Sequence, residues 1–172
     1  MSPVLLALIV LNSPLQDSPP AKVKAKPAAA SNAPVSVADS SHVFRMVTDA
    51  LHHVLKLPEP NLPKLTGSNL TAEQAASEFR AIFEYARPKF EFKPLPLEFE
   101  ERKWTLKSAK AREDARLLVS YGCLAKVGPI VCSKNGLLTA KQFGDAVGMF
   151  LGRIAEITHV PSQEFSPYLH GE

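Results

Sequence analysis

The residues best placed for chemistry are two threonines, each followed by a glutamine three positions later. Thr71 and Gln74 lie in the peptide Leu-Thr-Ala-Glu-Gln, and Thr139 and Gln142 lie in Leu-Thr-Ala-Lys-Gln. This spacing predicts a capping box, which starts a helix. The positive N-terminal end of a helix favours an anionic group, and Lys141 adds positive charge at the second start. The candidate ligand-binding residues are therefore Thr71, Thr139, Lys141 and Gln142.

The remaining polar residues show no pattern typical of catalysis. None of the five histidines lies in a nucleophile or metal motif, and the adjacent His52 and His53 face different directions on a helix. Acidic and basic residues alternate between Glu98 and Arg116, which is typical of a solvated helical face. We therefore predict a protein that is not an enzyme and that uses no cofactor and no metal.

The two cysteines allow two interpretations. Cys123 and Cys132 flank a loop that contains Gly128 and Pro129 and can fold back on itself. In an exported protein they would form a disulfide; otherwise both are small buried hydrophobic residues. Neither has a histidine at zinc-binding spacing, so a structural metal site is not predicted.

Composition and charge exclude several classes of protein. The chain has 172 residues, of which 45% are apolar, as expected for one globular core. The formal net charge of +3 is too small and too evenly spread for a nucleic-acid binder. The apolar run at residues 4–11 is shorter than the roughly 20 residues of a membrane-spanning helix. We interpret residues 1–18 as a signal peptide and expect a secreted chain with no membrane span after cleavage.

Proline and glycine divide the rest of the chain into segments. Residues 19–38 are rich in Pro, Ala and Lys, cannot bury enough apolar surface to fold, and are predicted to form a disordered tether. Residues 39–89 are predicted to contain a helix that is capped within residues 39–41 and ends near Lys56. A proline-containing connection then leads to a helix from Thr71 to Pro88. Residues 90–107 form an extended linker with two prolines.

Residues 108–160 repeat this order, and residues 161–172 form a C-terminal tail. A helix that begins near Ser108 should end at Gly122 in a left-handed cap. The next helix, residues 140–157, should bury Phe143, Ala146, Val147, Phe150, Leu151 and Ile154. It also carries Gly144, Gly148 and Gly152, spaced for close approach of another helix or of the proline-rich linker; the alternative is a glycine-floored ligand groove.

The fold class predicted from these segments is all-α. The recurrence of Leu-Thr-Ala-x-Gln between two apolar-periodic segments indicates a duplication. We expect two helix-loop-helix units, packed in one small domain that follows the disordered N-terminal tether.

Residues 110–154 resemble the S-layer homology (SLH) domain of bacterial envelope proteins. The resemblance depends on the helix end at Gly122, the loop through Gly128 and Gly136, the Leu138-Thr139 entry, and Phe143 in the final helix. Residues 42–87 look like a more degenerate copy. The arginine that follows the threonine in the family is replaced by alanine in both copies.

The resemblance implies a non-enzymatic module of the bacterial cell envelope. Such a module would be secreted and would attach to, or assemble on, an anionic cell-wall polysaccharide through its SLH-like repeats. The alternative is a helical module for protein-protein interaction or self-association that binds no polymer.

Overall fold

The computed structural model describes residues 32–91 and 98–169. Within them the chain forms five α-helices and no strand, which confirms the all-α prediction. The predicted signal peptide, residues 19–31 of the tether and residues 92–97 of the extended linker lie outside the described residues. The helices are α1 (Val37–Leu55), α2 (Ala72–Ala86), α3 (Ala109–Ser120), α4 (Ala140–Thr158) and α5 (Ser166–Leu169), with the short 3₁₀ helices η3 (Arg87–Lys89) and η4 (Ser162–Phe165).

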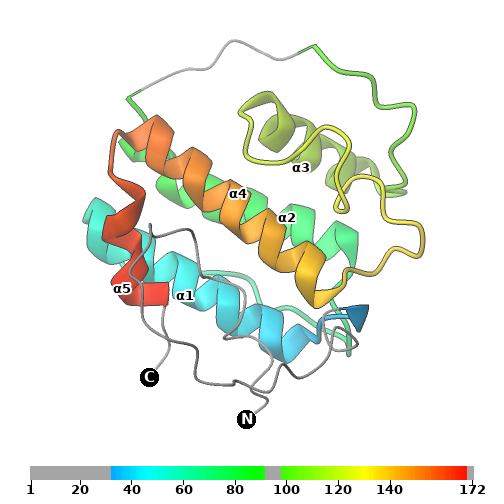
Figure 1. The fold of residues 1–172 in the computed structure, drawn as a ribbon, viewed down its shortest axis with the longest axis horizontal. Helices are drawn as coiled ribbons and strands as arrows, with labels where there is room; N and C mark the ends of the chain where they lie inside the picture. The colour runs from blue at the N-terminus through cyan, green and yellow to red at the C-terminus, as the bar shows by residue number, and fades with distance from the viewer. Residues whose placement is uncertain (1–31, 92–97, 170–172) are drawn as a thin grey trace, which may run out of the picture.

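Helices α1, α2 and α4 lie side by side and enclose an aromatic core (Figure 1). The Phe44 ring of α1 meets Phe79 of α2 and Phe143 of α4 edge-on, each with a centroid separation of 5.1 Å. Phe79 also contacts Phe150 of α4 at 5.0 Å. All six residues predicted for the apolar face of α4 are buried, so that prediction is confirmed.

The starts of α2 and α4 are the capping boxes predicted from the sequence. The amide of Gln74 donates to Thr71 Oγ1 (3.1 Å), and the amide of Thr71 donates to Gln74 Oε1 (3.0 Å). The same pair of bonds joins Thr139 and Gln142 at 3.0 and 3.2 Å. These bonds satisfy N–H groups that a helix start otherwise leaves without partners.

Helix α1 begins three to five residues before the predicted caps at 39–41, and residues 37 and 38, assigned to the disordered tether, belong to this helix. Its N-cap is Ser36, whose hydroxyl accepts from the amide of Asp39 and donates to the Asp39 carboxylate. Asp39 and Ser40 are also good capping residues by type, which made the start ambiguous in the sequence. In the structure the Ser40 hydroxyl instead donates to the carbonyl of Val37.

The residues immediately before the three caps form a closed ring of backbone hydrogen bonds. The amide of Val35 donates to the carbonyl of Leu138 (2.9 Å), that of Leu138 to Leu70 (3.4 Å), and that of Leu70 to Val35 (2.9 Å). All three side chains are buried. The first amide of each helix adds an outer bond: Val37 to Ser68, Ala72 to Gly136, and Ala140 to Ala33.

In this ring the start of α1 takes the same position as the starts of α2 and α4. A duplication into two helix-loop-helix units would instead make α1 the counterpart of α3, which lies outside the ring and begins at its own cap, Ser108. The two-unit repeat is therefore not confirmed, although the two threonine starts that suggested it are.

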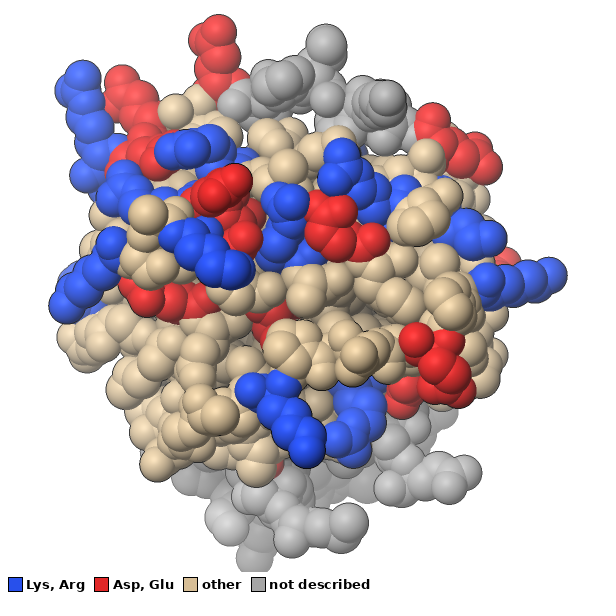
Figure 2. All heavy atoms as spheres, turned by 180° about the vertical axis from the view of Figure 1, so that it is seen from behind, with Lys and Arg blue, Asp and Glu red and all other residues tan. Residues whose placement is uncertain are grey.

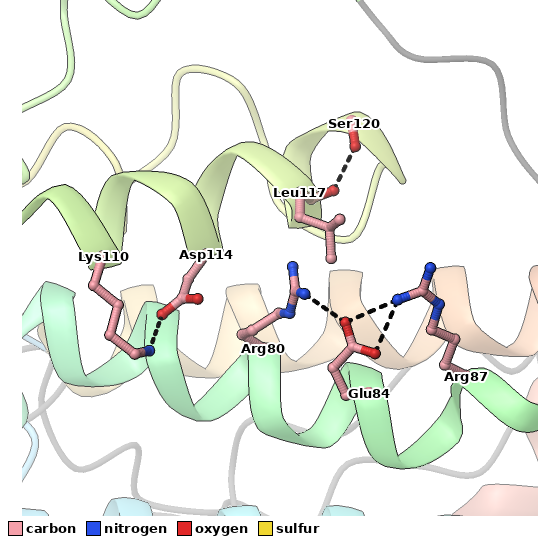
Figure 3. Close-up of polar contacts among 7 residues, drawn as sticks. All are labelled: Arg80, Glu84, Arg87, Lys110, Asp114, Leu117 and Ser120. Carbon is pink, nitrogen blue, oxygen red and sulfur yellow. Dashed lines mark hydrogen bonds and ion pairs between the residues drawn. The ribbon is translucent and has the colours of Figure 1, made fainter.

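Helix α3 packs alongside α2 (Figure 3), and a polar contact joins the two helices. The Ser77 hydroxyl of α2 donates to the Asp114 carboxylate of α3 (2.9 Å), and Asp114 also pairs with Lys110 at 2.6 Å. Gly122 has φ +75°, as predicted for a left-handed helix end. Before α3, Trp104 is buried and donates from Nε1 to the carbonyl of Lys126, which fixes the last part of the extended linker.

The predicted C-terminal tail is folded as far as Leu169. Helices η4 and α5 pack against α1, and Phe165 is fully buried. The Tyr168 ring stacks on His53 with a centroid separation of 4.9 Å. Segments of four residues are too short to show a helical period, so these contacts could not be predicted from the sequence pattern.

At two of the α4 glycines, the described residues supply no close neighbour. A Cβ placed on Gly148 or Gly152 would meet no atom of the described residues within 4 Å. Met149 between them is 42% exposed. This face of α4 is therefore open in the described part of the chain.

No helix among residues 32–91 and 98–169 combines the length and the apolar content required to cross a membrane.

A candidate ligand cleft at the start of helix α2

The two predicted helix-start sites lie at one end of the three-helix bundle. Backbone bridges pair Thr71 with Leu137, and Thr139 with Pro34. The structure therefore brings the two repeated peptides together, although they are far apart in the sequence.

A cleft of about 460 Å³ opens at the start of α2. Three segments line it: residues 71–73, residues 105–107 and the loop residues 133–137. Of the predicted ligand-binding residues, only Thr71 lines this cleft. Thr139, Lys141 and Gln142 do not.

Side-chain hydrogen bonds fix the walls of the cleft. The Thr105 hydroxyl donates to the carbonyl of Ser133 (2.7 Å), and the Ser133 hydroxyl donates to the carbonyl of Leu137 (2.9 Å). The amide of Thr105 also donates to the carbonyl of Val131. The loop and the segment before α3 are therefore held against each other.

Charges of both signs line the cleft. Lys107 and Lys134 are exposed, and Glu73 faces them from the first turn of α2. The Glu73 carboxylate accepts from the amides of Lys107 (2.7 Å) and Ser108 (2.9 Å). These two hydrogen bonds, of which the one from Ser108 has the larger effect, lower the pKa of the Glu73 carboxyl group. Glu73 is therefore ionised at neutral pH. With Glu73 engaged by two amides, Lys107 and Lys134 are the cationic side chains left to meet a ligand in this cleft.

The amides at the helix starts are less available than the sequence suggested. In α2, the amide of Ala72 is bonded to Gly136 and that of Gln74 to Thr71. In α4, the amide of Ala140 is bonded to Ala33 and that of Gln142 to Thr139. These four amides are therefore engaged within the protein and are not available to an anion.

Lys141 lies on an exposed turn and forms an ion pair with Asp145. The Nζ–Oδ2 distance is 2.6 Å, and the side chains are 61% and 57% exposed. Exposed pairs of this kind are worth roughly 0–1 kcal/mol, so Lys141 is free to exchange partners. A neighbouring carboxylate nevertheless reduces the attraction of this turn for an anion.

A larger cleft of about 680 Å³ lies between α2, α3 and residues 98–101. Its guanidinium groups are already paired: Arg116 contacts Glu101 at 2.6 Å, and Arg80 contacts Glu84 at 2.6 Å (Figure 3). The bond from Arg116 is the main reason why the pKa of Glu101 is lowered. Figure 2 shows basic and acidic side chains interleaved on the face opposite that of Figure 1, rather than a surface of one sign.

The cysteines are free thiols in this structure. Cys123 is fully buried, and burial raises its pKa to about 12. Cys132 is half-buried. The disulfide that the sequence left open is not formed, and Cys123 has the environment of a small buried hydrophobic residue.

Among residues 32–91 and 98–169, no three His, Cys, Asp or Glu side chains are arranged to hold a metal ion.

Sequence reasoning missed Lys107, Lys134 and Thr105 as cleft residues. Lys134-Asn135-Gly136 reads as a turn, which was the one local signal. The contact between residues 105 and 133 joins two loops that are distant in the chain, and no spacing rule predicts it.

The fold and the cleft define a small all-α bundle with three tied helix starts and a mixed-charge cleft beside one of them. No known protein family, curated protein or solved structure matches the chain.

Proposed function

We propose that this protein is a non-enzymatic, exported module of the bacterial cell envelope that attaches to an anionic cell-wall polysaccharide. The observation that carries the proposal is the cleft at the start of α2, where Lys107 and Lys134 stand beside hydroxyl and backbone groups. The resemblance to SLH repeats supports it, because the cleft adjoins one of the two repeated threonine starts.

The chemistry of the cleft suits an acidic saccharide. Lys107 and Lys134 supply positive charge for a carboxylate or phosphate group, and the hydroxyl and carbonyl groups of the walls suit sugar hydroxyls. The cleft lysines take the place of the family arginine, which is alanine at positions 72 and 140. A lysine is a point charge without the bidentate fork of arginine, so binding should be weak per site and sensitive to salt.

Retention of the full chain on purified cell-wall sacculi tests this proposal. We expect binding to sacculi that carry acidic polymers and little binding to sacculi from which these polymers have been stripped. Replacing Lys107 and Lys134 with Glu should reduce retention about tenfold or more. The matched control replaces Lys89 and Lys126 with Glu, which makes the same change in net charge outside the cleft.

Two results would contradict polymer binding through this cleft. One is failure of the wild-type chain to bind sacculi at low salt. The other is an equal loss of retention in the cleft and control variants, which would indicate a diffuse charge effect.

Self-association is the second candidate function, and the open face of α4 favours it. No atom of the described residues packs against Gly148 or Gly152 from outside the helix, and the exposed Met149 lies between them. Each glycine costs roughly 1 kcal/mol relative to alanine within a helix, and a partner helix that packs closely here would offset this cost. Light scattering should then detect a dimer that Gly148→Leu abolishes. A monomer at all concentrations would rule out this function.

A further inference from the structure

A proline-rich connection runs along one face of α2. Residues 58–66, which we call the strap, join the end of α1 to the turn before α2 and contain Pro58, Pro60 and Pro63. The Tyr85 hydroxyl donates to the carbonyl of Pro58 (2.5 Å). At the other end, Gln74 Nε2 donates to the carbonyl of Thr66 (2.7 Å). The strap therefore runs antiparallel to α2.

Glu78 lies between these two attachments. At 100° per residue, Gln74, Glu78 and Tyr85 fall within about 40° of one another around the helix axis. Gln74 and Tyr85 are separated by about 16 Å along the axis, a distance that the strap spans easily. Glu78 is only 3% exposed, although Gln74 and Tyr85 on the same face are half-buried. On this face of α2, Glu78 therefore lies between the two points where the strap is attached, and it is shielded from solvent.

The strap is held by few contacts. Within the described residues, no backbone amide between positions 59 and 66 donates a hydrogen bond. Its attachments are the two side-chain bonds above, a contact of the His52 ring with the carbonyl of Pro58 (3.2 Å), and the partly buried Leu62 and Leu65, which pack against the core. A segment with so few bonds can open locally while the helices remain folded.

We propose that the strap is a pH-sensitive cover on α2, closed when the Glu78 carboxyl group is protonated and loosened when it is ionised. An ionised carboxylate buried beneath the strap loses part of its hydration, and opening the strap restores it. A protonated carboxyl group imposes no such charge penalty. The state of this one side chain therefore sets how tightly the strap lies on α2.

The direction of the pH effect follows from the burial of Glu78. Burial raises its pKa from 4.5 to about 7, and it is the only cause of the shift. No charged neighbour compensates for it. The ionisable side chains on the elements packed around this face are Asp49, His52, His53 and Lys56 on α1, Glu59 and Lys64 on the strap, and Tyr85 on α2 itself.

The opening equilibrium therefore rises with pH between about 4.5 and about 7 and levels off above that range. In this window Glu78 is ionised when the strap is open and protonated when the strap is closed. A rise in pH therefore favours opening. Between pH 5.5 and pH 7.5 the opening equilibrium should increase on the order of tenfold.

Cleavage of the Lys64–Leu65 bond by trypsin reports on opening of the strap. Rates on the full chain are measured from pH 5.5 to 8.5 and divided by those on a short peptide of the strap sequence, which removes the pH dependence of the protease. We expect the normalised rate to rise on the order of tenfold and then level off in the wild type. It should stay nearly constant in Glu78→Gln.

Controls separate the strap from other sources of pH dependence. Cleavage at Arg116 in α3 and Arg153 in α4, followed by mass spectrometry in the same samples, reports on opening of the helices; these sites should remain protected. Glu84→Gln is the matched control on α2, because Glu84 lies outside the strap and is more exposed, at 36% of its side chain. It should behave as the wild type. His52→Gln tests the contact of the imidazole ring with Pro58.

Three outcomes would overturn the proposal. They are a normalised rate that does not change with pH in the wild type, an unchanged pH response in Glu78→Gln, and simultaneous cleavage of the strap and the helices. If Glu78→Gln folds poorly by circular dichroism, Glu78→Met provides a second neutral side chain of similar size for the same comparison.

Discussion

The Glu73 carboxylate in the first turn of α2 accepts a hydrogen bond from the backbone amide of Ser108, the N-cap of α3, at 2.9 Å. The same oxygen accepts from the amide of Lys107 at 2.7 Å. One acidic side chain thus fixes where α3 begins relative to α2. It also sets the position of Lys107 at the candidate cleft.

Replacing Glu73 with alanine should loosen the start of α3. We expect a loss of about 1 kcal/mol in the free energy of unfolding, at the low end for bonds to a charged group because the site is open to solvent. Urea denaturation at pH 7 measures this loss. Because the folded pKa of Glu73 is lowered, its stabilisation is present above its unfolded pKa of 4.5 and disappears as the pH falls below it. A difference between wild type and variant that is the same at pH 3 and pH 7 would contradict this role.

Glu78 should make the whole domain less stable as the pH rises. Its folded pKa is raised, so the folded state binds more protons than the unfolded state between pH 4.5 and about 7, and stability falls across that window. The full effect is about 3 kcal/mol. Thermal denaturation of Glu78→Gln should show a higher Tm than the wild type at pH 8 and a smaller difference at pH 5. Equal Tm values at pH 8 would count against the burial cost.

The two capping boxes should contribute similarly to stability. Thr71→Ala and Thr139→Ala each remove an acceptor for a first-turn amide, at a cost of about 1 kcal/mol. Thr→Ser at either position retains the hydroxyl and should recover most of this loss. Chemical denaturation of the four variants makes the comparison, and no difference between Ala and Ser would show that the hydroxyl is not the stabilising group.

Phe79 should be the costliest single truncation on α2. It is fully buried and contacts Phe44, Phe143 and Phe150, so it joins all three core helices. Phe79→Ala should lose about 3–5 kcal/mol through lost burial and a residual cavity. Phe90→Ala is the comparison, since Phe90 lies at the edge and is only partly buried. Equal losses in the two variants would contradict the arrangement of the core.

The two thiols should react at different rates. Cys123 is buried with a pKa of about 12, so almost no thiolate forms at pH 8 and no reagent reaches it in the folded state. Cys132 is half-buried and should be labelled first by a thiol-specific chromophore. In denaturant both should react. Fast labelling of Cys123 under native conditions would place it outside the core.

Local signals in the sequence predicted the helix starts and the buried face of α4. Thr71 with Gln74, and Thr139 with Gln142, interact within one turn, and an apolar face repeats every 3.6 residues, so both can be read without knowledge of the tertiary structure. The start of α1 was misplaced because Ser36, Asp39 and Ser40 are all good capping residues. Only the packing of Val35 against the core selects Ser36 as the N-cap among these three residues.

The features that the sequence did not reveal depend on contacts between distant segments. Glu78 looks like an ordinary polar residue of a surface helix, and only the folded structure shows that it is buried. Lys107 and Lys134 become neighbours only when the linker before α3 meets the loop after it. Gly148 and Gly152 suggested a neighbouring helix, but their spacing does not show which side of α4 faces the core.

The ring formed by Val35, Leu70 and Leu138 makes the folding of the three core helices interdependent. Each of these residues donates one backbone hydrogen bond and accepts another. Losing any one of the three segments therefore leaves a buried donor and a buried acceptor without partners. Sliding one helix by a single residue would break its bonds to both others. Fragments that lack the segment around Val35 should therefore fail to fold, even when they retain α2, α3 and α4 complete.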